Sequence, residues 1–144
     1  MNEVEYLYHG SPYLFDIIRP QKARGENLNC SLYAIYAGEN FDDVIPFALP
    51  IRWYPDDPSG KRSFACQNGI VKIMQGTLNP NGFGYVYKIK ATHFEKIDHW
   101  QWVSYQEIIP EERIEIRVKD YWERVIFSEE AKAATAALYG MADL

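Results

Sequence analysis

The chain has 144 residues, of which 47% are hydrophobic and 15% aromatic, and its formal charge is -5 at pH 7. This length fits a single domain over residues 1–144 with a proper core, and the apolar content excludes intrinsic disorder. The acidic balance argues against a nucleic-acid partner held by phosphate contacts, because such binding needs clustered Lys and Arg.

Two further features of the composition bear on location. Cys30 and Cys66 lack the spacing of a metal site or of a disulfide framework, so we expect two thiols in a reducing compartment, with a disulfide left open. No stretch approaches the roughly 20 apolar residues that cross a bilayer, and we find no signal peptide. The sequence therefore predicts a cytoplasmic protein without a membrane partner. The candidates for a local basic patch, which we interpret as solvated loop charges, are Lys22, Arg24, Arg52, Lys61 and Arg62.

The first half of the chain contains two predicted strands and one predicted helix. The strands are residues 4–8 and 31–37, separated by a loop over 12–30. Asn40 is suited to cap a helix that begins at Phe41. Pro46 conflicts with that register, whereas a start near residue 43 would place it in the tolerated first turn, so the start of the helix stays open.

The second half is richer in strands. A long loop over 50–68 precedes them, and an Ala-rich helix follows, capped by Ser128. In the predicted strand over residues 83–91, Tyr85, Tyr87 and Ile89 share one face. The predicted strands are 69–75, 83–91, 100–105 and 113–118. The sum is an α+β fold with mostly antiparallel strands and short helices outside.

Three short stretches place polar or aromatic side chains where strands end. The first is His9-Gly10-Ser11, the second is Ala34-Ile35-Tyr36-Ala37, and the third begins at Gln101. An aromatic residue, Phe47, follows Tyr36 at a spacing of 11 residues.

This order resembles the ADP-ribosyltransferase family in its His-Tyr-Glu branch, which includes the poly-ADP-ribose polymerases and the rifamycin-modifying transferases. The resemblance spans about residues 4–118 with large loops between the motifs. It implies a split β-sandwich that binds NAD as a substrate, transfers one ADP-ribose unit to an acceptor that the sequence does not identify, and releases nicotinamide.

The resemblance also implies a role for each motif residue. His9 would bind the adenosine-side ribose, while the backbone of Gly10 and the hydroxyl of Ser11 would bind the nicotinamide carboxamide. Tyr36 and Phe47 would stack on the nicotinamide ring, since stacked rings gain about 0.5–1.5 kcal/mol beyond burial. Taken singly, each of these residues also has an ordinary structural role, such as a turn glycine, a capping hydroxyl or a packed ring.

Gln101 departs from the family pattern, which has Glu at this position. An amide oxygen accepts hydrogen bonds but carries no charge. Three outcomes follow: a slower or specialised mono-ADP-ribosyltransferase, a non-catalytic module that binds NAD or an ADP-ribose-like ligand, or a substitute carboxylate. The nearby carboxylates are Asp98 and Glu107, which both lie outside the predicted strand.

Other chemistry has less support in the sequence. His93 and His99 do not form a ligand set with the scattered cysteines, so no metal site is expected. Gly82-Phe83-Gly84 is too short for a nucleotide-binding loop and is interpreted as a turn. The RNA 2'-phosphotransferases share the fold of the resemblance, but the acidic balance disfavours them. An unrelated α+β domain is the remaining alternative, in which His9, Tyr36 and Gln101 would not meet.

Overall fold

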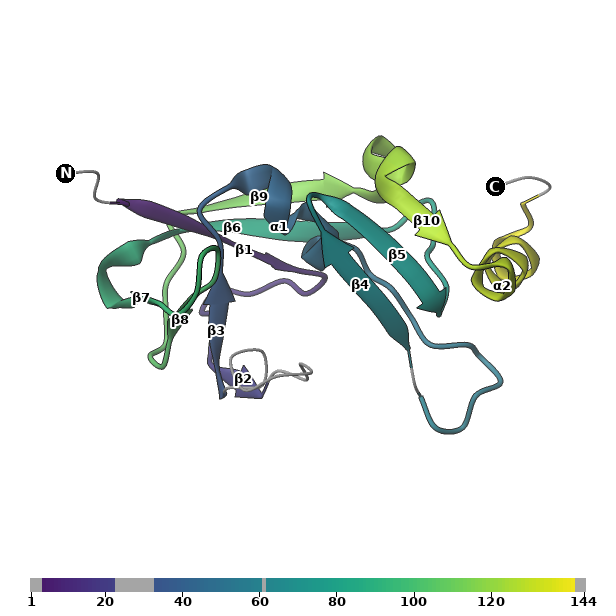
Figure 1. Cartoon of the computed structure of the whole chain (residues 1–144), viewed down its shortest axis with the longest axis horizontal. Helices are drawn as coiled ribbons and strands as arrows, with labels where there is room; N and C mark the ends of the chain where they lie inside the picture. The colour runs from purple at the N-terminus through teal and green to yellow at the C-terminus, as the bar shows by residue number, and fades with distance from the viewer. Residues whose placement is uncertain (1–3, 23–32, 61, 142–144) are drawn as a thin grey trace.

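The computed structural model describes residues 4–22, 33–60 and 62–141, which form an α+β fold of three small sheets with two α-helices (Figure 1). The central sheet has the order β1-β6-β9 and is antiparallel throughout. Its strands are β1 (Tyr6–Ser11), β6 (Phe83–Lys90) and β9 (Glu112–Arg117). In β9, Ile116 is buried between exposed Glu115 and Arg117, which confirms the predicted alternation.

The other two sheets flank the central one. The sheet with order β2-β3-β8-β7 is antiparallel, whereas in the sheet with order β10-β5-β4 strand β10 runs parallel to β5. The strands of the first are β2 (Gln21–Lys22), β3 (Tyr33–Ala37), β7 (Glu95–Lys96) and β8 (Trp102–Ser104). Those of the second are β4 (Ser63–Gln67), β5 (Ile70–Gln75) and β10 (Val125–Phe127). The 3-10 helices η2 (Ala91–His93) and η3 (Val118–Arg124) connect them.

The first helix, α1 (Phe41–Ala48), begins at the earlier of the two predicted starts. The side chain of Asn40 accepts from the N–H of Asp42 at 2.9 Å, as a capping residue does. Pro46 lies inside the helix and has no N–H for the carbonyl four residues earlier, which belongs to Asp42. The Nη1 of Arg124 donates to that carbonyl at 3.3 Å. A residue from the far end of the chain thus satisfies the acceptor that the proline leaves, and the helix tolerates Pro46.

Two glycines allow α1 to lie directly on the central sheet. A Cβ atom on Gly84 would lie 1.6 Å from the carbonyl oxygen of Ala48, and one on Gly10 would lie 2.4 Å from that of Val44. Only a residue without a side chain permits such an approach of helix to strand. These contacts fix α1 beside the end of β1.

The last helix, α2 (Glu129–Tyr139), has the predicted cap. The Oγ of Ser128 accepts from the N–H of Ala131 at 3.1 Å. The helix ends at Gly140, whose φ of 67° is the left-handed conformation typical of this position.

Several predicted boundaries differ from the structure. Strand β1 continues through His9, Gly10 and Ser11 instead of ending before them. The predicted loop 50–68 contains β4, and the predicted strand 100–105 is shortened to β8. The predicted loop 12–30 contains β2, and its residues 23–30 lie outside the described residues. The first two residues of the predicted strand 31–37 and Lys61 also lie outside them, as do Arg24 and Cys30 of the loop.

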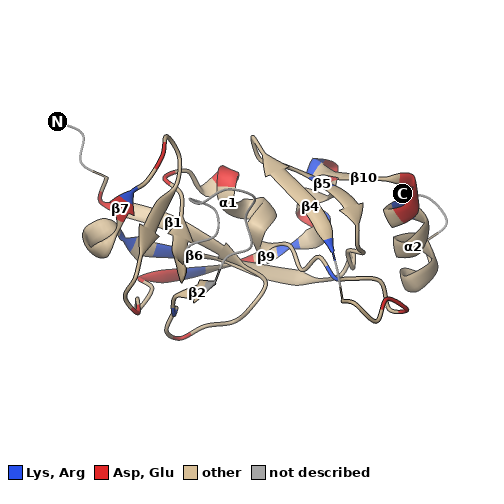
Figure 2. Ribbon diagram, turned by 60° about the horizontal axis from the view of Figure 1, so that its bottom comes forward, with Lys and Arg blue, Asp and Glu red and all other residues tan. Residues whose placement is uncertain are grey.

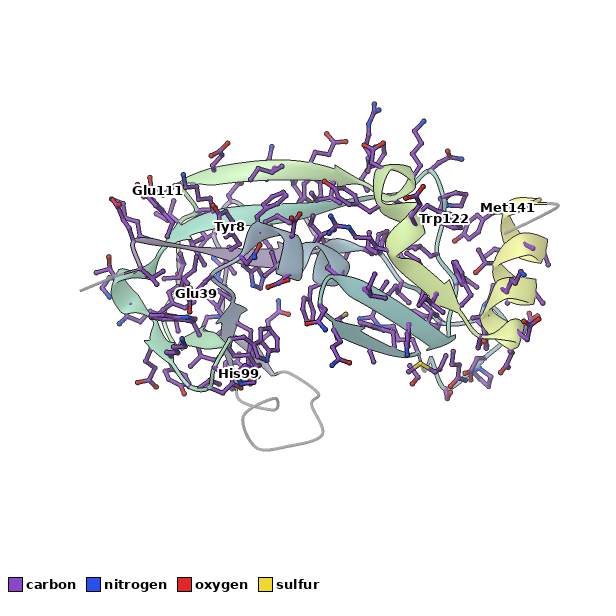
Figure 3. The ribbon with its side chains drawn as sticks, turned by 45° about the horizontal axis from the view of Figure 1, so that its top comes forward. Tyr8, Glu39, His99, Glu111, Trp122 and Met141 are labelled. Carbon is purple, nitrogen blue, oxygen red and sulfur yellow. The ribbon has the colours of Figure 1, made fainter. Side chains whose placement is uncertain are left out.

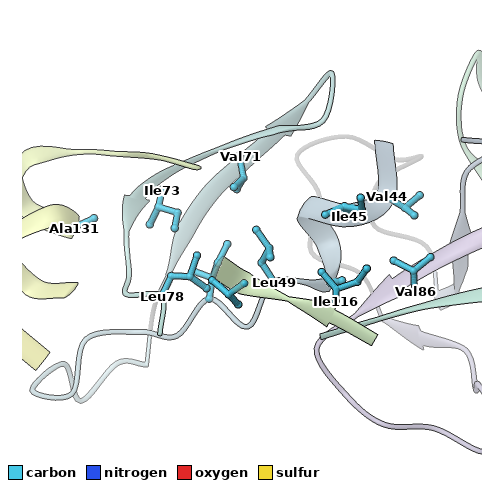
Figure 4. Close-up of a cluster of buried hydrophobic side chains, with 12 residues drawn as sticks. Val44, Ile45, Leu49, Val71, Ile73, Leu78, Val86, Ile116 and Ala131 are labelled. Carbon is cyan, nitrogen blue, oxygen red and sulfur yellow. The ribbon is translucent and has the colours of Figure 1, made fainter. Parts of the chain in front are cut away.

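Apolar side chains form two clusters on opposite faces of the central sheet. The first lies among α1, β5 and β6 and includes Ile45, Val71 and Val86 (Figure 4). The second includes Leu7, Tyr87 and Ile89 together with Ile35 of β3, and Tyr85 packs against it. The predicted shared face of Tyr85, Tyr87 and Ile89 is therefore confirmed.

Charged residues of both signs are mixed along β9, whereas the charged residues of β6 are Lys88 and Lys90 (Figure 2). Of the described basic residues that were candidates for one patch, Lys22 lies on β2, whereas Arg52 and Arg62 belong to the segment before β4. Among the helices that the structure describes, none is long and apolar enough to cross a membrane.

Candidate functional site

The first two sequence motifs meet where β1 and β3 diverge. The backbones of Tyr8 and Gly38 exchange two hydrogen bonds, of 2.8 and 2.9 Å. Continuing this antiparallel ladder would pair Gly10 with Tyr36, but among the described residues no further bridge forms between the two strands. Instead, the Nδ1 of His9 lies 2.6 Å from the carbonyl oxygen of Tyr36. The His9 side chain thus joins the two motifs at the point where the strands separate.

The protonation state of His9 follows from this contact. Burial lowers the pKa of His9 below its ordinary value of 6.5, and the hydrogen bond to Tyr36 offsets only part of that shift. The imidazole is therefore neutral at pH 7. Because a carbonyl only accepts, the proton is on Nδ1, and Nε2 presents a lone pair. A neutral imidazole in this tautomer can accept a hydrogen bond from a hydroxyl group.

Gly10 presents backbone groups at the same opening. The N–H and C=O of alternate strand residues point to the same edge, so those of Gly10 face the side on which Tyr8 meets Gly38, away from β6. The missing side chain of Gly10 admits α1, with Phe47 so near that a Cβ on Gly10 would lie 3.2 Å from the Cβ of Phe47. Gly10 thus offers one donor and one acceptor close to the Cβ of Phe47.

Phe47 stacks on a ring that the sequence analysis did not single out. Its ring and that of Trp100 have centroids 6.2 Å apart and planes inclined by 20°. Phe47 is 38% exposed and Trp100 39%, so the pair forms a partly open aromatic surface rather than core packing. Such a surface can take a further flat ring.

Trp100 precedes Gln101 in a tight loop between β7 and β8. The N–H of Ile97 donates to the carbonyl of Gln101 at 2.9 Å and closes the loop. Asp98 Oδ1 accepts from the backbone N–H of Trp100 at 3.0 Å and from that of Gln101 at 2.8 Å. Asp98 Oδ2 accepts from the Nε2 of Gln101 at 2.6 Å. Asp98, named above only as a substitute carboxylate, is therefore bound directly to Gln101, which is itself buried.

Electrostatics keep Asp98 ionised. Burial alone would raise the pKa of its carboxyl, but the hydrogen bonds from Trp100 and Gln101 together hold that pKa below its usual value. The other suggested carboxylate, Glu107, pairs with Arg19 at 3.1 Å on the surface. Of the two, only Asp98 contacts Gln101 in the residues described.

Tyr36 and Gln101 belong to neighbouring parts of the β3–β8 pair. Tyr36 lies opposite Val103, and Gln101 lies in the loop directly before β8. The indole of Trp102 donates to Glu39 at 2.9 Å, and Lys96 lies 3.2 Å from the same carboxylate. The hydrogen bond from Trp102 makes the largest contribution to lowering the pKa of Glu39, and the one from Lys96 lowers it further. Together they hold β8 against the turn after β3.

Ser11 has a local role in the structure. It is buried, and its Oγ accepts from the N–H of Tyr13 at 3.1 Å, as a turn hydroxyl does. Ser11 is the last residue of β1, and its side chain serves the following turn.

The residues that the fold brings together come from β1, β3, α1 and the loop before β8. They are His9, Gly10, Tyr36, Phe47 and Gln101.

Two open hollows lie elsewhere on the surface. One, of about 740 Å³, is lined by Tyr54 and its neighbours and by α2, so it lies between this part of the long loop and the last helix. The other, of about 810 Å³, is lined by residues that include Glu5, Lys90 and Trp102. None of the five residues brought together above lines either hollow.

The remaining histidines show no ligand arrangement. In the described residues no group of three or more His, Cys, Asp or Glu is placed to hold a metal ion. His93 and His99 are exposed, and His99 lies on the side of the molecule that carries β3 and β8, far from Met141 after α2 (Figure 3).

Sequence reasoning missed the stacking role of Trp100 and the hydrogen bonds of Asp98. One signal was present, because an Asp three residues before Gln101 has the spacing of a side chain that caps a turn. Nothing in the spacing indicated that Trp100 would lie on Phe47, since that contact depends on how α1 lies on the sheet.

Comparison of the chain with protein-family models gives no match, and neither does comparison with curated proteins or with solved structures.

Proposed function

We propose that this protein is an ADP-ribosyltransferase-like domain, with the split β-sandwich of that family, that binds NAD where β1 and β3 diverge. The observation that carries the proposal is the hydrogen bond from His9 to the Tyr36 carbonyl. It joins the first two motifs and leaves Nε2 of His9 as an acceptor for a ribose hydroxyl. The backbone of Gly10 faces the same opening and suits a carboxamide.

The aromatic residues support the nicotinamide half of this assignment. Phe47 lies beside Gly10, so a carboxamide bound to the Gly10 backbone would bring its ring toward Phe47. Tyr36 lies on β3 opposite β8, and Gln101 lies in the loop directly before β8. In the family reaction the bond between nicotinamide and ribose breaks, its electron pair leaves with nicotinamide, and an acceptor nucleophile bonds to the same carbon and loses its proton. Positive charge develops on the ribose, so an acceptor oxygen on Gln101 would stabilise it.

The acceptor of ADP-ribose is part of the proposal only as an unspecified nucleophile.

We also propose a cytoplasmic location. Cys66 is a free thiol, and burial raises its pKa to about 12, so it stays protonated and unreactive. A free, inert thiol suits a reducing compartment.

Nicotinamide release from NAD tests the enzymatic form of the proposal. We expect slow release by the wild-type protein and a loss of at least tenfold in Tyr36→Ala. The matched control is Tyr33→Ala, on the same strand but 67% exposed, which should release nicotinamide at the wild-type rate. Equal rates in the two variants would contradict the assignment of Tyr36.

The second candidate function is a non-catalytic module that binds NAD or an ADP-ribose-like ligand. Gln101 favours it, because losing one preorganised electrostatic group costs roughly 10²–10³ in rate. If the wild-type protein binds NAD but releases no nicotinamide, and Gln101→Glu gains release, the module is the correct description.

A further inference from the structure

The loop between β7 and β8 directs three hydrogen-bond donors onto one carboxylate. Asp98 accepts from the backbone N–H groups of Trp100 and Gln101 and from the Gln101 side chain, at 3.0, 2.8 and 2.6 Å. The two backbone bonds go to Oδ1 and the side-chain bond goes to Oδ2. Oδ1 of Asp98 thus stabilises the turn, while Oδ2 holds the Gln101 amide.

The chemistry of the two groups fixes the orientation of Gln101. An ionised carboxylate only accepts, so the amide atom that faces Asp98 has to be the NH₂ group. The oxygen and the nitrogen of the amide are bonded to the same planar carbon and point in different directions. The amide oxygen of Gln101 therefore points away from Asp98. A short hydrogen bond between an amide and a charged group is stronger than a neutral one, and it polarises the amide oxygen.

We propose that Asp98 and Gln101 act as a carboxylate–amide pair that recognises the cationic nicotinamide ring and the ribose attached to it. Gln101 supplies the acceptor oxygen, and Asp98 is a positioning residue that orients the amide and supplies the negative charge that the family's Glu would carry. This role rests on the NAD-binding function proposed above and specifies the charge state of the ligand that the site prefers.

The charge of Asp98 distinguishes this role from a purely structural one. The nicotinamide ring of NAD is positively charged, whereas that of NADH is neutral. A nearby carboxylate therefore favours NAD over NADH. A residue that only shapes the loop would affect both ligands alike.

The test measures the dissociation constants of NAD and NADH by titration calorimetry for the wild-type protein and three variants. Asp98→Asn keeps one oxygen for the backbone bonds of the turn but removes the charge and the acceptor for Gln101. Asp98→Asn combined with Gln101→Glu exchanges the two groups and restores the pair in reverse. Asp120→Asn is the matched control, because Asp120 is an exposed carboxylate of η3.

We expect Asp98→Asn to weaken NAD binding about tenfold, the effect on affinity typical of losing one hydrogen bond to a charged group, with a much smaller effect on NADH. The exchanged pair should recover the NAD affinity, and Asp120→Asn should match the wild type. Unchanged NAD binding in Asp98→Asn, an equal loss for NAD and NADH, or no recovery in the exchanged pair would overturn the pair while leaving NAD binding intact. No NAD binding by the wild-type protein would overturn both proposals.

Discussion

At the scale of single residues, His9 has two roles, one in the structure and one in the proposed binding of a ligand. Its Nδ1 donates to the Tyr36 carbonyl, with which the β1 backbone does not pair, and its Nε2 keeps a lone pair that can accept a hydrogen bond. Both roles require the neutral ring, which burial favours by lowering the pKa of His9. The stability of the fold and the binding of a hydroxyl group therefore depend on the same protonation state.

The titration of His9 predicts a pH dependence of stability. The unfolded chain, with the ordinary His pKa of about 6.5, binds the proton more readily than the folded protein. We therefore expect the free energy of unfolding to be constant above about pH 6.5 with respect to this group, and to fall as the pH drops toward the lower pKa of the folded state. Urea denaturation at pH 7.5 and 5.5 measures the difference.

Two substitutions isolate the contribution of His9. His9→Asn keeps an N–H near the position of Nδ1 but does not titrate, so its stability should change less over this pH range. His93→Asn replaces an exposed histidine and should keep the wild-type pH dependence. If His9→Asn shows the full wild-type dependence, the proton is bound elsewhere.

At the scale of elements, α1 is the part whose position depends most on distant residues. Gly84 and Gly10 give it room on the sheet, and Arg124 donates to the carbonyl that Pro46 leaves without its helical donor. Arg124 also pairs with the side chain of Asp42 at 3.3 Å. The helix in turn carries Phe47 to its place beside Gly10. The position of Phe47 therefore depends in part on Gly84 and Arg124, which are not among the site residues.

The two glycines predict a ranked loss of stability. Gly84→Ala would bring a Cβ to 1.6 Å from the Ala48 carbonyl oxygen, whereas Gly10→Ala would bring one to 2.4 Å from that of Val44. Both neighbours are backbone atoms and cannot move aside alone. We expect Gly10→Ala to lower the free energy of unfolding by about 1–3 kcal/mol, the range for overpacking, and Gly84→Ala to lower it further. Chemical denaturation measures both free energies of unfolding. If Gly84→Ala is as stable as the wild type, the described position of α1 on the sheet is contradicted.

Sequence patterns predicted the elements that depend on local alternation. Strands β6 and β9 were placed within a residue or two. In β9 apolar and polar residues alternate, whereas β6 is rich in aromatic and branched apolar residues and buries side chains on both faces. Strand β4 was missed, since its residues follow a segment rich in Pro and Asp that is typical of a loop. The short β8 was overextended because its aromatic neighbours resemble strand residues.

At the scale of the whole molecule, the candidate site is made by segments that are far apart in the sequence. His9 and Tyr36 are 27 residues apart, and the segment with Gln101 follows much later. Local periodicity does not determine such contacts, so the sequence alone supported the site only through the resemblance of ordered motifs. The path by which β1 and β3 pair once and then separate became visible only in the structure.

The most direct test of the central claim is titration calorimetry of NAD with the wild-type protein, Phe47→Ala and Ile126→Ala. Ile126 is an exposed apolar residue of β10, which belongs to a different sheet from β1 and β3 (Figure 1), and serves as the control. We predict saturable binding by the wild-type protein and by Ile126→Ala, with an affinity at least tenfold lower in Phe47→Ala. No heat of binding at millimolar NAD, or equal affinity in all three proteins, would contradict the account.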